Sequence, residues 1–188
     1  MEECVGKEKR SPAVFLDRDG VIIVEKNFQA DPNDIEFIPG SVEGLLKLNP
    51  KYLKVVVSNQ SGIARGYFSH DEAVAVNQAV DEKLSLSGIR IDAWYFCPHG
   101  PDDGCDCRKP RPGLIMKAAD ELDLELSASW IIGDKSSDIG AGTAAGIRTI
   151  LVKTGYAGKE PGADDSKPDF TADNLYCAID IINKGVGI

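Results

Sequence analysis

The sequence predicts an α/β fold, a three-layer, Rossmann-like parallel sheet flanked by helices, and three observations support this. Short β-branched runs alternate with segments of helical spacing, the order that a parallel sheet covered by helices produces. Hydrophobic residues make up 43% and charged residues 27% of the 188-residue chain, which is enough apolar material for one buried core. Polar side chains follow directly after the apolar runs, where ligands bind in sheets of this kind.

Five strands and five helices are expected in alternating order. The strands are Ala13–Leu16, Leu53–Val57, Ile91–Phe96, Trp130–Gly133 and Thr149–Val152. The helices are Ser41–Leu48, Ser69–Leu86, Pro112–Leu124, Ser137–Ala145 and Leu175–Ile182. The second helix opens with Ser69 and Glu72 in the spacing of a capping box, and Pro112 suits the first turn of the third.

The domain organisation is expected to be simple. Residues 1–10 are charged and are expected to form a flexible N-terminal tail, whereas residues 11–188 are expected to form a single domain. Residues Gly155–Pro168 have the polar, Gly- and Pro-containing composition of a loop. Only about twenty residues separate Gly20 from the first expected helix, so no separate cap domain is expected there.

Composition and charge exclude several classes of function. The net charge of −9 argues against non-specific nucleic-acid binding, although a local pocket can still attract an anionic substrate. No apolar run approaches the roughly 20 residues that span a membrane, and the first ten residues lack the apolar stretch of a signal peptide. A cytoplasmic protein without a membrane or nucleic-acid partner is therefore expected.

Two carboxylates, Asp17 and Asp19, stand two residues apart where the chain leaves the first expected strand. Alternation sends both side chains towards the same side if the strand persists. Such a pair can hold Mg²⁺ through oxygen ligands. One carboxylate can also attack phosphorus while its neighbour donates a proton to the leaving oxygen. A solvated turn is the alternative interpretation of this motif.

Asp134 and Asp138 follow the fourth expected strand with the spacing that places both on one face at a helix start. Asp134 would complete the Mg²⁺ site, and Asp138 would orient Lys135 or the waters of the metal. The alternative is capping of the helix by the acidic side chains.

The second and third strand ends carry groups suited to an anion. Ser58 opens a polar loop whose hydroxyl and backbone N–H groups could cradle a phosphate. Arg108 and Lys109 supply cations, and Lys109 could neutralise charge on a phosphoryl group in transfer. Either feature alone could be an ordinary turn or solvated surface.

The loop at residues 97–107 contains three cysteines and a histidine in a C-x-H-x5-C-x-C pattern: Cys97, His99, Cys105 and Cys107. Three thiolates and one imidazole are the usual ligands of a closed, four-coordinate structural zinc site. We therefore expect a small zinc-binding loop that holds its shape and does not activate water. A redox thiol pair or a chance arrangement is the alternative.

The order of these motifs resembles the haloacid dehalogenase superfamily of phosphatases over residues 12 to 185. The resemblance implies that Asp17 is the nucleophile and Asp19 the general acid/base, and that Ser58 and Lys109 hold the phosphoryl group. It also implies that Mg²⁺ is held by Asp17, the backbone carbonyl of Asp19, and Asp134.

Two stretches, residues 58–66 and 97–110, look like the D-glycero-D-manno-heptose 1,7-bisphosphate 7-phosphatase family, which implies a small phosphorylated sugar as substrate and C7 phosphate hydrolysis through an aspartyl-phosphate. Substrate-binding residues expected on this basis are Glu25, Lys26, Asn27, Phe28, Asn59, Gln60, Ser61, Arg65, Arg108 and Lys135. Mg²⁺ is the expected catalytic cofactor, Zn²⁺ the structural one, and a monomer the expected state.

Three alternatives stay open. The histidinol-phosphate phosphatases share the zinc loop, and the polynucleotide 3′-phosphatases have a similar second loop but fit an acidic chain less well. A non-catalytic, zinc-stabilised binding module would be expected to lack at least one of four residues, and none is missing: Asp17, Asp19, Lys109 and Asp134.

Overall fold

A computed structural model describes residues 10–185, in which six parallel strands form one sheet in the order β3-β2-β1-β4-β5-β6. The strands are β1 (Ala13–Leu16), β2 (Leu53–Asn59), β3 (Ala93–Cys97), β4 (Trp130–Gly133), β5 (Arg148–Val152) and β6 (Phe170–Ala172). The helices are α1 (Ser41–Lys47), α2 (His70–Leu86), α3 (Gly113–Glu121), α4 (Ser136–Ala144) and α5 (Leu175–Asn183), with a 3₁₀ turn at Leu126–Ala128. The expected N-terminal tail lies outside the described residues, apart from Arg10.

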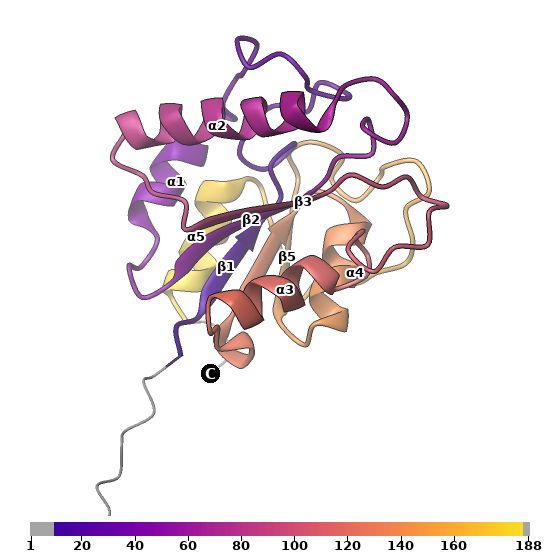
Figure 1. The fold of residues 1–188 in the computed structure, drawn as a ribbon. Coiled ribbons are helices and arrows are strands. Elements are labelled where there is room, and N and C mark those ends of the chain that lie inside the picture. Colours follow the sequence, from indigo (N-terminus) through magenta and orange to yellow (C-terminus); the bar gives the residue numbers. More distant parts are fainter. Residues whose placement is uncertain (1–9, 186–188) are drawn as a thin grey trace, which may run out of the picture.

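Helices cover both faces of the sheet, so the predicted three layers are confirmed (Figure 1). Along β1, the side chains of Val14 and Leu16 join a core with α1, α2 and α5, and those of Ala13 and Phe15 join a second core with α3 and α4. All four are fully buried, as expected for a central strand of a parallel sheet. The alternation of side chains along the strand therefore builds two cores from one apolar run.

The expected strands and helices are present, with shifts of a few residues at their ends. The capping box at α2 is confirmed: Ser69 Oγ accepts from the Glu72 N–H, and Glu72 Oε2 accepts from the Ser69 N–H. Strand β6 was not expected from the sequence, and it pairs with β5 through Thr171 and Leu151. Its three residues are too few to show a period of two.

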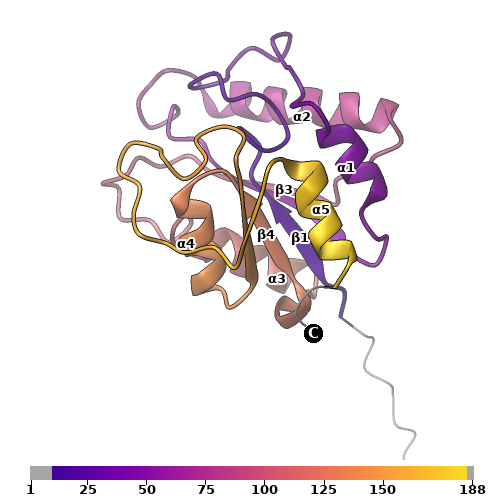
Figure 2. The ribbon, with the colours of Figure 1, turned by 180° about the vertical axis from the view of Figure 1, so that it is seen from behind.

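The carboxyl ends of the strands meet at one edge of the sheet, and the long connections gather there. The loops that follow β3 and β5 lie side by side in both views of the ribbon (Figures 1 and 2). The connection from β1 to α1 has only isolated bridges, Asp19 with Ile23 and Ile23 with Phe37, so no cap domain is inserted in it. None of the described helices combines the length and the apolar character needed to cross a membrane.

Candidate active site

Asp17 lies at the floor of the site, directly after β1. Its N–H donates to the carbonyl of Ile132 on β4 at 3.0 Å. This hydrogen bond continues the pairing of β1 with β4 by one residue and fixes the position of the Asp17 backbone. Its Oδ1 accepts from the N–H of Arg18 at 2.9 Å and lies 3.1 Å from Lys109 Nζ. Burial alone would raise the pKa of Asp17, but the Lys109 and Lys135 ammonium groups outweigh burial and hold that pKa below its usual value. Asp17 is therefore an ionised carboxylate at neutral pH.

The ammonium group of Lys109 is buried and touches three acceptors. Its Nζ donates to the carbonyl of Val57 at 2.7 Å and lies 2.5 Å from Asp138 Oδ1 and 3.1 Å from Asp17 Oδ1. Burial opposes the charge, but Asp138 and Asp17 outweigh it and raise the pKa of Lys109. The main chain of Lys109 is held by Asn59, whose amide donates to its carbonyl at 3.0 Å and accepts from its N–H at 3.1 Å.

Three buried carboxylates, Asp17, Asp134 and Asp138, each place an oxygen within 4.8 Å of the others. Asp134 Oδ2 accepts from the Tyr156 N–H at 2.8 Å, but Asp134 Oδ1 is buried and has no hydrogen-bond partner among the described residues. Burial raises the pKa of Asp134 to about 8. A buried carboxylate oxygen without a donor is a costly arrangement for a protein alone, and a hard cation satisfies it. The cluster therefore fits Mg²⁺.

Two glycines allow the backbone to close around Asp134. Gly20 and Gly155 have φ values of +84° and +60°, and a Cβ at either would lie 2.4 Å or 2.2 Å from Asp134 Oδ2. Any other residue would clash with the carboxylate and would also adopt a strained backbone.

Asp138 has two partners, and neither is the ammonium of Lys135. Its Oδ2 accepts from the backbone N–H of Lys135 at 3.0 Å and so caps α4, while Oδ1 faces Lys109. Burial raises the pKa of Asp138. Asp138 thus caps α4, which was the alternative role expected for it, and also serves as a counter-ion for Lys109.

The carboxylate of Asp19 is not part of this cluster of three. It accepts from the fully buried Arg18, with Arg18 Nη2 at 2.9 Å from Oδ2 and Nε at 3.2 Å from Oδ1. Gln60 Nε2 donates to both Asp19 Oδ2 and Ser58 Oγ, at 3.0 Å and 2.8 Å. Arg18 in turn donates to Asn77 on α2 at 2.7 Å. The direction of the Asp19 side chain is therefore set by α2 and by the loop after β2.

Lys135 reaches across the site to the first loop. Its Nζ lies 3.0 Å from Glu25 Oε2, 3.9 Å from Asp17 Oδ2 and 4.0 Å from Asp134 Oδ1. Burial would lower the pKa of Lys135, but these three carboxylates outweigh it and raise the value. Lys135 therefore carries its charge beside the carboxylate cluster, where it can meet an anionic ligand.

A cavity of about 690 Å³ adjoins this cluster through Lys109 and Lys135, whereas Asp17 and Asp134 are buried and do not line it. Most of the expected substrate-binding residues line it, together with the expected catalytic groups Asp19 and Lys109: Glu25, Asn27, Phe28, Asn59, Gln60, Ser61, Arg108 and Lys135. Lys26 and Arg65 do not, since Lys26 Nζ pairs with Asp34 and Arg65 is exposed, 5.8 Å from the Phe28 ring. Ser58 is buried behind Gln60.

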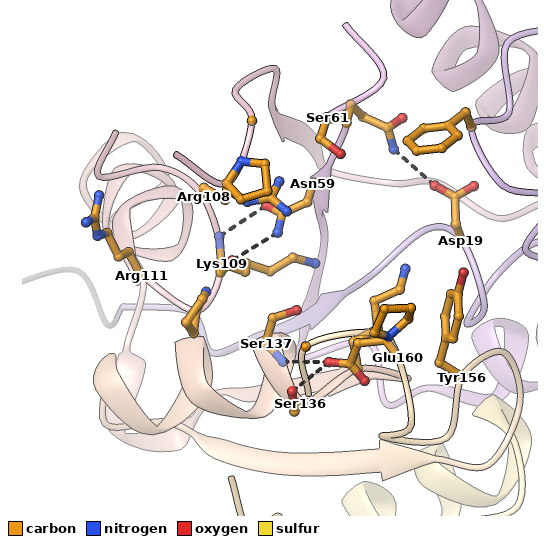
Figure 3. Close-up of a pocket in the computed structure, with 18 of the residues that line it drawn as sticks. Asp19, Asn59, Ser61, Arg108, Lys109, Arg111, Ser136, Ser137, Tyr156 and Glu160 are labelled. Carbon is orange, nitrogen blue, oxygen red and sulfur yellow. Dashed lines mark hydrogen bonds between the residues drawn. The ribbon is translucent and has the colours of Figure 1, made fainter. Parts of the chain in front are cut away.

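One wall of this cavity was not expected from the sequence, and it comes from the start of α4 and from the loop after β5. Figure 3 shows Ser136, Ser137 and Glu160 together, with Glu160 accepting from both serines, and Tyr156 on the same side as Asp19. The unexpected lining residues include Ser136, Ser137, Tyr156, Glu160 and Asp164 from this wall, and Gln29 and Arg111 from other loops. The strand-end rule that located Asp17 could have found the loop, because that loop also follows a parallel strand.

The zinc loop forms another wall. Cys97 Sγ lies 3.1 Å from Cys107 Sγ and 3.6 Å from Cys105 Sγ, and His99 Nδ1 lies 3.3 Å from Cys107 Sγ. Four ligands at about 2.0–2.3 Å from a tetrahedral zinc lie roughly 3.3–3.8 Å from one another, close to the observed separations of 3.1, 3.3 and 3.6 Å, so the cluster fits a closed zinc site. Burial raises the pKa of the Cys97 thiol. A bound zinc ion would favour the ionised form of this buried thiol.

The fold and the site together define a phosphatase of the haloacid dehalogenase type. Asp17, Ser58, Lys109 and Asp134 lie at the ends of neighbouring strands or in the loops that follow them, around a buried carboxylate cluster. The HAD-hydrolase-like family model matches residues 106–178, which hold Lys109 and Asp134.

Two curated relatives are similar over most of the chain. The D-glycero-β-D-manno-heptose-1,7-bisphosphate 7-phosphatase of Vibrio cholerae is 44% identical over 160 residues, 80% of this chain and 86% of the relative. The protein of the same name from Escherichia coli K12 is 39% identical over 156 residues, 78% and 82% of the two chains. This chain therefore belongs to the D-glycero-β-D-manno-heptose-1,7-bisphosphate 7-phosphatase family of HAD-like phosphatases.

A solved structure has the same fold. The crystal structure of D,D-heptose 1,7-bisphosphate phosphatase from B. bronchiseptica, complexed with magnesium and phosphate, superposes with a TM-score of 0.83 at 32% identity. The match covers 93% of this chain and 99% of that one.

Proposed function

We propose that this enzyme hydrolyses the C7 phosphate of D-glycero-β-D-manno-heptose 1,7-bisphosphate in a Mg²⁺-dependent reaction. The observation that carries the proposal is the buried cluster of Asp17, Lys109 and Asp134, because its member Lys109 also lines a cavity that the zinc loop helps to wall. The names of the curated relatives support the choice of sugar, phosphate position and β anomer.

The residues divide the reaction into two displacements. Ser58 and Lys109 bind the C7 phosphate, and a carboxylate oxygen of Asp17 attacks phosphorus in line. The bond from phosphorus to the C7 oxygen breaks, and Asp19 gives that oxygen its proton. Asp19, now ionised, takes a proton from water, whose oxygen attacks the aspartyl-phosphate. Inorganic phosphate leaves, and the Asp17 carboxylate is restored.

The chain prepares several features of this reaction before substrate arrives. Lys109 keeps Asp17 ionised and close to the attack position through its contact with Oδ1 at 3.1 Å. The Arg18 and Gln60 donors fix the direction of the Asp19 side chain before substrate binds. Asp19 must therefore turn away from Arg18 to reach the leaving oxygen. Asp17, Asp134 and the main-chain carbonyl of Asp19 would hold Mg²⁺, which supplies charge neutralisation of the phosphoryl oxygens.

The proposal also covers the oligomeric state and the cellular location of the protein. We propose that residues 11–188 act as one domain and as a monomer, because the large exposed apolar side chains of the described part come from different helices and loops: Phe28, Leu46, Tyr67, Leu86, Met116 and Tyr176. Among these side chains, Phe28 and Tyr67 are in ring contact, with their centroids 4.8 Å apart. A zinc site of three thiolates fits the reducing cytoplasm. Light scattering on a sizing column tests the monomer directly.

A comparison of kcat/KM for four substrates tests the activity. The substrates are the β and α anomers of the heptose 1,7-bisphosphate, histidinol phosphate and 3′-phosphorylated DNA, each with Mg²⁺. We expect the β bisphosphate to exceed the others by at least about tenfold, a difference of 1.4 kcal/mol in transition-state binding. A higher value for histidinol phosphate or the DNA would overturn the assignment of substrate.

A further inference from the structure

Tyr156 makes three contacts that join separate parts of the site. Its backbone N–H donates to Asp134 Oδ2 at 2.8 Å, and its hydroxyl donates to Asn27 Oδ1 at 2.9 Å. Lys135 Nζ lies 5.1 Å from the centre of its ring, within reach of a cation–π contact. In Figure 3 the ring stands at the edge of the cavity, between the loop after β5 and the side where Asp19 lies. One residue therefore touches the carboxylate cluster, a cation and the first loop.

The first loop needs such a contact because its backbone is strained. Asn27 and Phe28 are consecutive residues with φ values of +51° and +67°, a region that residues other than glycine rarely adopt. Such a conformation persists only where neighbouring groups hold it. Within the loop, Glu25 Oε1 accepts from the Asn27 N–H at 2.9 Å, and Glu25 Oε2 is anchored by Lys135. The hydroxyl of Tyr156 supplies a further anchor, from across the cavity.

The position of Tyr156 also places it between two hollows. Besides the main cavity, the described residues form a second hollow of about 390 Å³, and Glu25, Asn27 and Tyr156 line both. The Tyr156–Asn27 bridge is thus part of the partition between them. If the bridge opens, the strained segment loses its support and the wall of the main cavity on this side becomes incomplete.

We propose that Tyr156 is a positioning residue that holds the Asn27–Phe28 segment against the sugar portion of the substrate. The inference rests on the proposed function, because it takes the ligand to be a phosphate ester whose organic part extends from Asp17 towards the first loop. The hydroxyl acts on this segment and not on the phosphoryl site, because its partner is Asn27. Loss of the hydroxyl therefore weakens binding of the organic part and leaves phosphate binding and the chemical step unchanged.

Tyr156→Phe removes only the hydroxyl, and Tyr176→Phe is its control, on α5 with its ring beneath Lys47. With the heptose bisphosphate, we expect KM to rise about fivefold in Tyr156→Phe, the ratio for one neutral hydrogen bond. We expect kcat, and the inhibition constant of inorganic phosphate, to stay within about twofold. Tyr176→Phe should match the parent in all three quantities. An unchanged KM, or an equal change in phosphate inhibition, would overturn the proposal.

A double-mutant comparison separates loss of the Tyr156–Asn27 hydrogen bond from a general loss of structure in the variant. Asn27→Gly removes the acceptor and suits the positive φ, so adding Tyr156→Phe to it should not change KM further. The same fivefold effect in both backgrounds would contradict the proposed contact.

A measurement without substrate separates this inference from the proposed function. Hydrogen exchange in the peptide covering residues 24–30 should be faster in Tyr156→Phe than in the parent and unchanged in Tyr176→Phe. Equal exchange in all three proteins would refute the positioning role even if the heptose bisphosphate proves not to be the substrate. Failure of the parent to hydrolyse the bisphosphate would instead remove the proposed function alone.

Discussion

Replacement of Asp134 by asparagine should stabilise the protein without magnesium and abolish its Mg²⁺-dependent activity. The side chain is fully buried, its Oδ1 has no hydrogen-bond partner among the described residues, and burial raises its pKa to about 8. Asparagine has nearly the same shape, and its carbonyl can still accept from the Tyr156 N–H. It carries no charge at any pH, so the variant folds without the cost of taking up a proton or burying a charge at this position, and it cannot bind the cation through a carboxylate.

The size of the effect follows from the two pKa values. The unfolded chain ionises Asp134 at its ordinary pKa of 3.8, whereas the folded chain keeps the proton until about pH 8. Between these values the unfolded state holds fewer protons, so the contribution of Asp134 to stability falls as the pH rises. At 1.36 kcal/mol per pH unit, the ceiling is about 6 kcal/mol. Asparagine recovers only part of it, because Lys135 loses an anionic neighbour at 4.0 Å. We expect a gain of about 2 kcal/mol at pH 8, or roughly 4–8 °C in Tm.

Thermal unfolding followed by circular dichroism tests this in magnesium-free buffer, with the zinc loop loaded in both proteins. The gain should be largest at pH 8 and should shrink towards pH 5, and millimolar Mg²⁺ should raise the Tm of the parent only. Asp173→Asn, an exposed carboxylate paired with Lys153, is the matched control and should leave Tm nearly unchanged. A variant less stable than the parent at pH 8, or a difference that does not depend on pH, would refute the reasoning.

Three further substitutions test the other parts of the site. Asp17→Asn should reduce phosphate release by at least about 10³-fold with an unchanged circular dichroism spectrum, because an amide cannot form the acyl phosphate. Cys107→Ser should lower the zinc content measured by atomic emission from one per chain towards zero and lower Tm. Gly20→Ala should weaken Mg²⁺ binding measured by calorimetry at least about tenfold, because its Cβ would lie 2.4 Å from Asp134 Oδ2.

Each of these variants has an informative opposite outcome. Turnover like that of the parent in Asp17→Asn would exclude this nucleophile, and full zinc occupancy in Cys107→Ser would exclude a four-ligand site. Gly88→Ala is the matched control for Gly20→Ala, since its φ of +78° is similar and no atom lies within 4 Å of the added Cβ. It should lose about 1–2 kcal/mol of stability from backbone strain and keep its Mg²⁺ affinity.

The strand-end rule explains why much of the site could be predicted from the sequence. Asp17, Ser58 and Asp134 are all close in sequence to the apolar run that ends beside them, so locating the run located the side chain. The Cys/His cluster was predictable for a similar reason, because its ligands fall within eleven residues. Local sequence patterns were therefore enough to predict the residues of the Cys/His cluster and the carboxylates Asp17 and Asp134.

The remaining features depend on partners far apart in the chain. Arg18 lies in the aspartate motif, for which a solvated turn was the alternative interpretation, yet it is fully buried and donates to Asn77, 59 residues away. Tyr156 meets Asn27 across 129 residues, and no local pattern records that contact. Such pairings depend on how the loops pack once the sheet has formed, which periodicity and spacing do not report.

The short chain segment between the zinc loop and Lys109 has a practical consequence for anyone preparing this enzyme. Only one residue separates the zinc ligand Cys107 from Lys109. The side chain of Asn59 holds the Lys109 backbone through two hydrogen bonds. The ammonium that contacts Asp17 is therefore aimed by a segment that zinc shapes. Cultures starved of zinc should yield protein of normal size and purity in which only the zinc-loaded fraction turns over substrate. The specific activity of a preparation then depends on how much zinc the culture medium supplied, so the zinc content should be measured together with every kinetic constant.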